Sequence, residues 1–251
     1  MLFKLVDETC AHIDQLALTT CANELEQQLR SEAPEAIHQL IKESKRLGSQ
    51  PSEKAAASVL ALSAFGYIKG IPALARHMVE KIQDSSLPAA RRCGIASVLS
   101  YLVNPKDLIG DDAPGGYGYL DDAIMLRAGL VAYMGTLPQP GSNVQTEARV
   151  VVFLVNLAPK NVRGTLQEAV TVMSHNVQTM SVLEPAIAET SLAHIIENPL
   201  DVPVPAAPLG FAPSVVNYKR MEWTGGAMFD GSNTTGPQGA SRIDAEAFIQ
   251  F

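Results

Sequence analysis

Cysteine is scarce in this chain of 251 residues, and its spacing excludes a framework built on cysteine chemistry. The three cysteines, Cys10, Cys21 and Cys93, form no CxxC pair and no metal-ligand pattern. Cys10 and Cys21 lie eleven residues apart, about three helical turns, which is too far for a disulfide on one straight helix. We therefore expect free thiols packed inside a reduced, cytoplasmic protein.

Charge is also low, and positive charge is in deficit. Charged residues make up 18% of the chain, and 19 Lys plus Arg face 26 Asp plus Glu, for a formal net charge of −7. This balance argues against non-specific binding to nucleic acid and against a polybasic membrane anchor. We expect no nucleic-acid partner.

Long hydrophobic runs are missing. The longest candidate, residues 55–68, has fourteen residues between Lys54 and Lys69, short of the roughly twenty that a spanning helix needs. The N-terminus has no basic start followed by a long apolar stretch, so we also expect no signal peptide. No transmembrane segment is predicted, and peripheral membrane association through residues 55–68 or 150–157 is kept as a third functional hypothesis.

Recognisable catalytic patterns are absent as well. The five histidines form no HExxH or H-x₃-H pair, no G-x-S-x-G elbow occurs, and Cys93 has no obvious histidine partner in sequence. We therefore name no catalytic residue, and the sequence favours a non-enzymatic protein over an enzyme.

Helical periodicity dominates what is present. Leu18, Cys21, Leu25 and Leu29 recur at three- and four-residue steps, the apolar stripe of an amphipathic helix. Pro34 fits the first turn of the next helix, and Gly48 ends that pattern. A run of valines at 150–152 would also suit a strand, but no alternating partner strand is found, so we prefer a helix. The further helices expected cover residues 53–69, 74–82, 91–103, 123–134, 147–157, 159–183 and 185–198, with an interruption at 70–72.

The predicted fold is mainly α: a helical bundle with a central Asp/Gly-rich hairpin and an extended arm rich in proline and glycine. The predicted regions are 1–87 (N-terminal helices), 88–137 (hairpin), 138–198 (C-terminal helices) and 199–251 (arm), as one compact unit plus the arm. Residues 198–251 hold six Pro and six Gly, which prevent regular helix. Disordered tails are poor in aromatic residues, whereas this one carries several, so we expect it to pack on the body or on another subunit. The arm residues assigned to interaction are Phe211, Tyr218, Trp223, Phe229, Phe248 and Phe251.

Residues 104–122 carry five aspartates and one lysine, a net charge of −4. Asn104 suits an N-cap, Pro105 the first helical position and Asp107 the third, where a carboxylate meets free N–H groups. Asp121 and Asp122 would lie in the first turn of the following helix. A tight reversal is expected between these two helix starts, and its glycines are Gly115, Gly116 and Gly118.

The aspartates allow three interpretations: capping and hairpin geometry, a site for a metal or a cationic partner, and catalysis. Clustered carboxylates suit Mg²⁺ or Ca²⁺, although the spacing is not that of an EF-hand. The candidate metal ligands are Asp107, Asp111, Asp112, Asp121 and Asp122. Arg91 and Arg92 open the preceding helix and either pair with these carboxylates or stay solvated.

Two segments carry a family resemblance: Tyr101-Leu-Val-Asn-Pro-Lys-Asp-Leu-Ile-Gly-Asp-Asp112 and Gly118-Tyr-Leu-Asp-Asp122. They resemble the YkvA-like domain (domain of unknown function 1232), an uncharacterised bacterial family. The resemblance covers about residues 91–134. It departs at Gly110, where such sequences often have proline, and at 113–117, which replace a more apolar turn. It implies a helical hairpin with an acidic loop and no established activity. The motif residues are Asn104, Pro105, Asp107, Asp111, Asp112, Gly115, Gly116, Gly118, Tyr119, Asp121 and Asp122.

These observations favour a non-enzymatic, cytoplasmic assembly protein that forms homo- or hetero-oligomers through its arm and needs no cofactor. The alternative is a divalent-metal-dependent enzyme of the phosphoester hydrolase type, which would use the hairpin aspartates with Mg²⁺ or Ca²⁺.

Overall fold

The computed structural model describes residues 1–105, 107–137 and 143–202. Those ranges contain α-helices, two short 3₁₀ segments and no strand, so the mainly-α prediction is confirmed. The aromatic residues of the predicted arm lie outside the described residues. The elements are α1 (Leu2–Gln15), α2 (Leu18–Glu32), α3 (Pro34–Arg46), α4 (Glu53–Lys69), α5 (Ile71–Gln83), α6 (Ala89–Leu102), η1 (Pro114–Tyr119), α7 (Leu120–Gly135), α8 (Asn143–Leu157), α9 (Arg163–Met180), α10 (Pro185–Glu197) and η2 (Pro199–Asp201).

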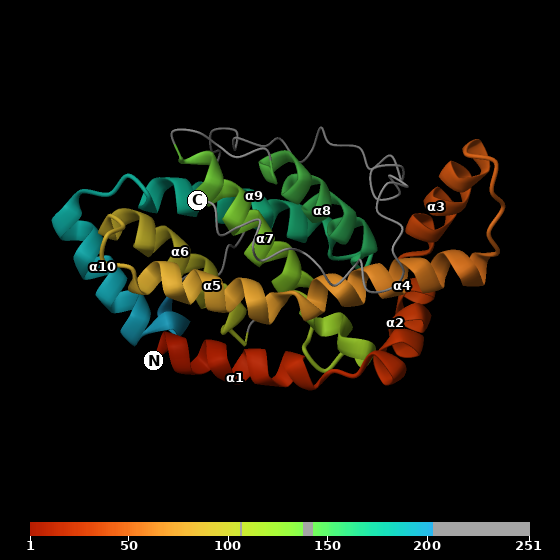
Figure 1. Cartoon of the computed structure of the whole chain (residues 1–251), viewed down its shortest axis with the longest axis horizontal. Coiled ribbons are helices and arrows are strands. Elements are labelled where there is room, and N and C mark those ends of the chain that lie inside the picture. Colours follow the sequence, from red (N-terminus) through yellow and green to blue (C-terminus); the bar gives the residue numbers. More distant parts are fainter. Residues whose placement is uncertain (106, 138–142, 203–251) are drawn as a thin grey trace.

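Helix α7 forms the centre of the bundle. Every residue from Leu120 to Ala132 is buried, and the helix packs against α6, α8 and α9. Helices α4 and α5 run end to end across the face shown in Figure 1, with α1 alongside α5. Helix α10 covers α6 at one end of the molecule, and α2 and α3 lie at the other end.

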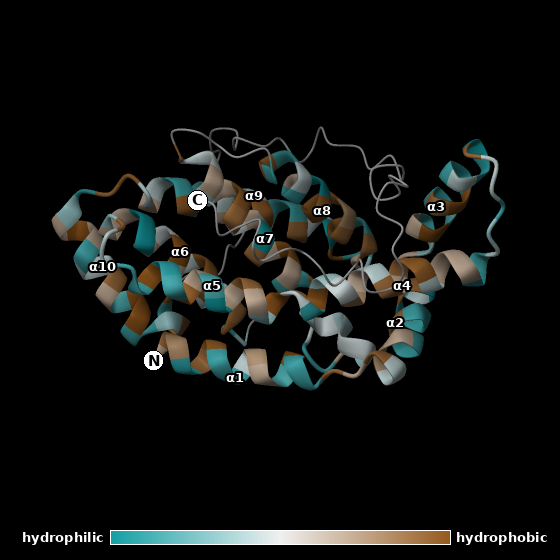
Figure 2. Ribbon diagram, viewed as in Figure 1, coloured by the Kyte–Doolittle hydropathy of each residue, from teal (hydrophilic) through white to brown (hydrophobic). Residues whose placement is uncertain are grey.

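The outer helices are amphipathic, as their sequence periodicity predicts. Cys21, Leu25 and Leu29 of α2 are buried, whereas Leu18, at the start of the same stripe, stays 44% exposed. Figure 2 shows hydrophobic and hydrophilic residues interleaved along α1 and α3. Pro34 does occupy the first turn of α3, and the valines at 150–152 are helical. The helix boundaries differ from the predicted ones by up to four residues.

The predicted interruption at 70–72 is much weaker than expected. Only Gly70 separates α4 from α5, and its backbone is itself right-handed helical (φ −77°, ψ −16°), because Pro72 lies in a first turn where its missing N–H costs no hydrogen bond. By length and hydropathy alone, the resulting stretch Glu53–Gln83 could cross a membrane. Half of its most apolar window is buried inside the bundle, as in the core helix of a soluble protein, so this is weak evidence and membrane association stays a prediction.

The three cysteines are free and buried. Burial raises the pKa of the Cys10 and Cys93 thiols to about 11. Both are therefore protonated at neutral pH, which suits packing and not nucleophilic chemistry.

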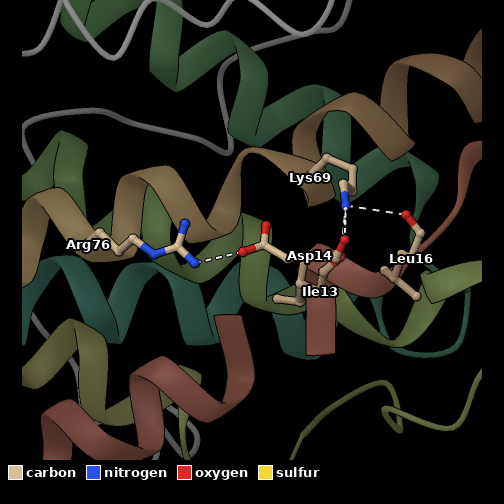
Figure 3. A network of polar contacts seen from close by, with 5 residues as sticks. All are labelled: Ile13, Asp14, Leu16, Lys69 and Arg76. Carbon is tan, nitrogen blue, oxygen red and sulfur yellow. Dashed lines mark hydrogen bonds and ion pairs between the residues drawn. The ribbon is translucent and has the colours of Figure 1, made fainter. Parts of the chain in front are cut away.

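A lysine from α4 closes the C-terminal end of α1 (Figure 3). The Lys69 ammonium donates hydrogen bonds to the carbonyl oxygens of Ile13 (3.0 Å), Asp14 (3.0 Å) and Leu16 (3.3 Å). About two helical turns further along, the Arg76 guanidinium contacts the Asp14 carboxylate at 2.6 Å. The last carbonyls of a helix have no partner within it, and here the Ile13 carbonyl also accepts a hydrogen bond from the N–H of Leu16 at 3.1 Å. Lys69 therefore adds donors at this helix end and fixes α1 against the α4–α5 junction.

We expect Lys69→Met to lower the free energy of unfolding by about 1–3 kcal/mol, because it removes charged donors from helix-end carbonyls that are partly buried. Arg76→Gln is the control, since the Arg76–Asp14 pair is about half exposed and should contribute less than about 1 kcal/mol. Urea unfolding followed by circular dichroism measures both. Equal losses in the two variants would contradict the role given to Lys69.

Candidate functional site: the acidic hairpin

The candidate site joins the end of α6 to the start of α7. Residues 103–105 and 107–113 form no helix, so the expected N-cap at Asn104, first position at Pro105 and third position at Asp107 are wrong. The chain instead turns through a loop and then through η1. The capping signal at Asn104 is not followed by an apolar stripe for a helix to bury, and glycine disfavours helix from Gly110 onwards.

Asp121 and Asp122 do lie in the first turn of α7, as predicted. Asp121 is fully buried, yet its carboxylate serves the loop. Its Oδ2 accepts hydrogen bonds from the N–H of Leu108 (2.8 Å), the N–H of Ile109 (3.2 Å) and the hydroxyl of Tyr101 (3.2 Å). One oxygen therefore ties together the last turn of α6, the loop and the start of α7.

The neighbouring carboxylate, Asp122, is 2% exposed. Within the described part of the chain, neither its Oδ1 nor the Oδ1 of Asp121 has a hydrogen-bond partner. Buried polar atoms without a partner are rare and costly. Two buried and unpartnered oxygens on consecutive residues are therefore the least ordinary feature of the hairpin.

Four aspartates repel one another electrostatically and form one group, the acidic group: Asp107, Asp111, Asp121 and Asp122. Burial, together with the charges on the other three, holds the pKa of Asp122 well above its ordinary value. Burial raises the pKa of Asp107 to about 7 with help from Asp111 and Asp121, and raises that of Asp121 to about 6 against the opposing effect of its hydrogen bonds. At neutral pH the group therefore keeps protons that separate carboxylates would lose.

The five predicted ligands are thus only partly brought together. Asp111 and Asp112 are exposed, and Asp107 is half-buried. The charge of Asp112 raises the pKa of Asp111 and is not among the charges that raise the pKa of Asp122. Across the described ranges, no group of three or more His, Cys, Asp or Glu side chains has an arrangement that could hold a metal ion. The metal site stays a prediction that this geometry does not favour.

The glycines set how closely the loop packs. Gly115 and Gly116 both adopt left-handed backbone conformations (φ +71° and +76°). A Cβ on Gly115 would lie 2.6 Å from the N of Leu25, and one on Gly118 would lie 2.5 Å from the Cα of Asp111. Both neighbours are backbone atoms that cannot rotate away. Glycine at these two positions lets η1 lie directly on α2 and on the loop.

The arginines that precede the hairpin do not contact its aspartates. Arg92 pairs with Glu189 of α10 at 3.1 Å, and Arg91 lines a cavity between α5, α6 and α7. The expected pairing across the hairpin is therefore wrong for Arg92, because its side of α6 faces α10.

Sequence reasoning missed two parts of the site. Tyr101 appeared only as the start of the motif, although its hydroxyl is a partner of Asp121. Arg127 lies 2% exposed inside α7, 2.5 Å from Glu147 of α8 and over the ring of Tyr67. The sequence does contain a signal for this ion pair, which is a single arginine inside the apolar run 123–134. A charge buried in such a run needs a partner.

Fold and site together define an all-helical bundle with two buried aspartates where an acidic loop meets a central helix. The family model of a protein of unknown function (DUF1232) matches residues 91–127, which run from the first turn of α6 to Arg127. The match contains every aspartate of the cluster together with Tyr101, and it ends before the 134 expected from sequence. No curated protein and no solved structure matches the chain.

The acidic group gives a pH-dependent stability with a defined sign. Carboxyls whose pKa is raised by folding bind more protons in the folded than in the unfolded state, so stability falls as pH rises from about 4 towards 7. We expect Asp122→Asn, a neutral mimic of the protonated form, to weaken this fall by up to about 1.4 kcal/mol per pH unit for one proton. Urea unfolding at pH 5 and pH 7 measures the change.

Asp84→Asn is the matched control for that experiment. Hydrogen bonds from Ser86 lower the pKa of Asp84, so Asp84 is ionised in both states between pH 5 and 7 and its removal should leave the slope unchanged. An identical slope in wild type and Asp122→Asn would contradict the raised pKa.

Proposed function

We propose that this protein is a non-enzymatic, cytoplasmic assembly protein whose helical body serves as a scaffold. The observation that carries the proposal is the inward burial of Asp121 and Asp122, 0% and 2% exposed, with Asp121 committed to holding the loop. A catalytic carboxylate must reach a substrate proton or a bound ion in an accessible position. Asp121 and Asp122 are instead turned into the bundle, where they act as internal supports.

The arm, residues 199–251, supplies the proposed contact with another subunit of the same or a different protein. Its sequence combines proline and glycine with many of the chain's aromatic residues, and aromatic side chains dominate the energetics of protein interfaces.

Light scattering tests this proposal on the full chain and on a chain that ends at Val202. We expect an oligomer from the full chain and a monomer from the shortened one. A full-length double variant, Trp223→Ser with Phe229→Ser, keeps the length of the arm and should also lose the oligomer. Helical content by circular dichroism checks that all three are folded, and a monomeric full chain would overturn the proposal.

The second candidate is a divalent-metal-dependent phosphoester hydrolase, and one observation favours it. The unpartnered oxygens of Asp121 and Asp122 are the acceptors that a hard cation would satisfy. A hydrolase of this type should hydrolyse p-nitrophenyl phosphate only when Mg²⁺ or Mn²⁺ is present. The activity should be lost in Asp122→Asn and should survive in Asp112→Asn. Equal rates in wild type and Asp122→Asn would remove this candidate.

A further inference from the structure

A second feature, separate from the acidic loop, is a cavity of about 130 Å³ between α5, α6 and α7. Its interior is apolar. Ile95 and Val98 of α6 and Leu130 and Met134 of α7 line it, and each of the four is less than a tenth exposed. An engineered cavity of about 150 Å³ with similar lining holds a benzene molecule. The interior therefore matches an apolar group of about six carbons.

Cationic side chains lie among the lining residues. Lys81 of α5 and Arg91 of α6 line the cavity, and neither Asp nor Glu does among the described residues. Within the same ranges no carboxylate lies within 4.0 Å of the Arg91 guanidinium, whereas its neighbour Arg92 is paired with Glu189. Arg91 is thus held beside an apolar cavity with its charge available to a ligand.

The remaining polar groups agree with an anionic ligand. The Tyr133 hydroxyl has no hydrogen-bond partner in the described part of the chain, and Arg91 is close enough to lower its pKa against the larger effect of burial. Asp84, the nearby acid, is engaged by the N–H and hydroxyl of Ser86 at 2.9 and 2.6 Å. His77, also in the lining, lies 3.5 Å from Glu80.

We propose that this cavity binds a small amphipathic anion: an acyl or aryl group of about six carbons that carries a carboxylate. The apolar group fills the space between Ile95, Val98 and Leu130, and the carboxylate contacts the Arg91 guanidinium. The Tyr133 hydroxyl donates a hydrogen bond to the same carboxylate, and Lys81 adds positive charge. The proposal is independent of the hairpin carboxylates and of the assembly function.

Isothermal titration of the full chain with hexanoate, hexan-1-ol and hexylammonium tests both parts of the proposal. We expect saturable hexanoate binding at least tenfold tighter than that of hexylammonium, because only the anion complements Arg91. Butanoate and dodecanoate should both bind more weakly than hexanoate, since one underfills the cavity and the other exceeds it. Equal affinity for the anion and the cation, or no saturable hexanoate binding, would overturn the proposal.

Two neighbouring arginines give a matched pair of variants. Arg91→Gln should weaken hexanoate binding about tenfold, which corresponds to about 1.4 kcal/mol, and leave hexan-1-ol binding unchanged. Arg92 lies on the same helix but faces Glu189, so Arg92→Gln should leave both affinities unchanged. Equal losses in the two variants would show that Arg91 is not the ligand contact.

Discussion

Gly118→Ala is expected to lower the free energy of unfolding by about 3 kcal/mol or more, enough to leave a marginal domain largely unfolded. The added Cβ would meet the backbone of Gly110 and lie 2.5 Å from the Cα of Asp111. A backbone clash cannot be relieved by a rotamer change, so the loop that Asp121 holds must move. Urea unfolding followed by circular dichroism measures the loss.

Gly164→Ala is the matched control. Gly164 lies in the first turn of α9, and no atom comes within 4 Å of the position its Cβ would take. The same chemical change should be neutral there or stabilise by up to about 1 kcal/mol, because alanine favours the helix. If the two variants unfolded at the same denaturant concentration, the close approach at Gly118 would have no energetic consequence.

The second large effect is expected at the ion pair inside the bundle. Arg127 and Glu147 are 2% and 7% exposed, their side chains meet at 2.5 Å, and the guanidinium lies 5.0 Å from the centre of the Tyr67 ring. Arg127→Met leaves the Glu147 carboxylate buried without its partner, which we expect to cost about 3–5 kcal/mol. Denaturant unfolding at pH 7 measures it.

Two further variants separate loss of the pair from loss of packing. Arg127→Met combined with Glu147→Leu removes both charges and should recover most of the stability, since a buried pair is often replaceable by apolar residues. Lys4→Met breaks the exposed Lys4–Glu8 pair and should change stability by less than about 0.5 kcal/mol. A double variant no more stable than Arg127→Met would show that the charge itself is not the cause.

Local rules were enough to predict the helical body. Ser52 caps α4 by accepting a hydrogen bond from the N–H of Ala55 at 3.1 Å, and Pro34 opens α3. Asp121 and Asp122 stand where the charge preference of a helix start places them. These features depend on residues within one turn of each other, so the sequence alone carries them.

The details of the site depend on contacts between distant residues, which spacing does not reveal. The partners of Asp121 lie 12, 13 and 20 residues away, and Arg127 meets Glu147 20 residues later. Asn104 is a residue type that suits an N-cap, yet no helix starts directly after it. A cap signal without a following apolar stripe does not make a helix, since most helical stability comes from packing.

The central claim is that Asp121 and Asp122 act as an internal support: burial raises the pKa of both carboxyls, and Asp121 ties α6, the loop and α7 together. Thermal unfolding of the full chain at pH 7, with 0 to 10 mM MgCl₂, CaCl₂ or MnCl₂, tests it most directly. The claim predicts a Tm constant to about 1 °C. A cation bound in the fold at a hundred times its Kd would add about 2.7 kcal/mol of stability, or about 5–10 °C for a chain of this size. A saturable rise of that size in the wild type, absent in Asp122→Asn, would contradict the claim.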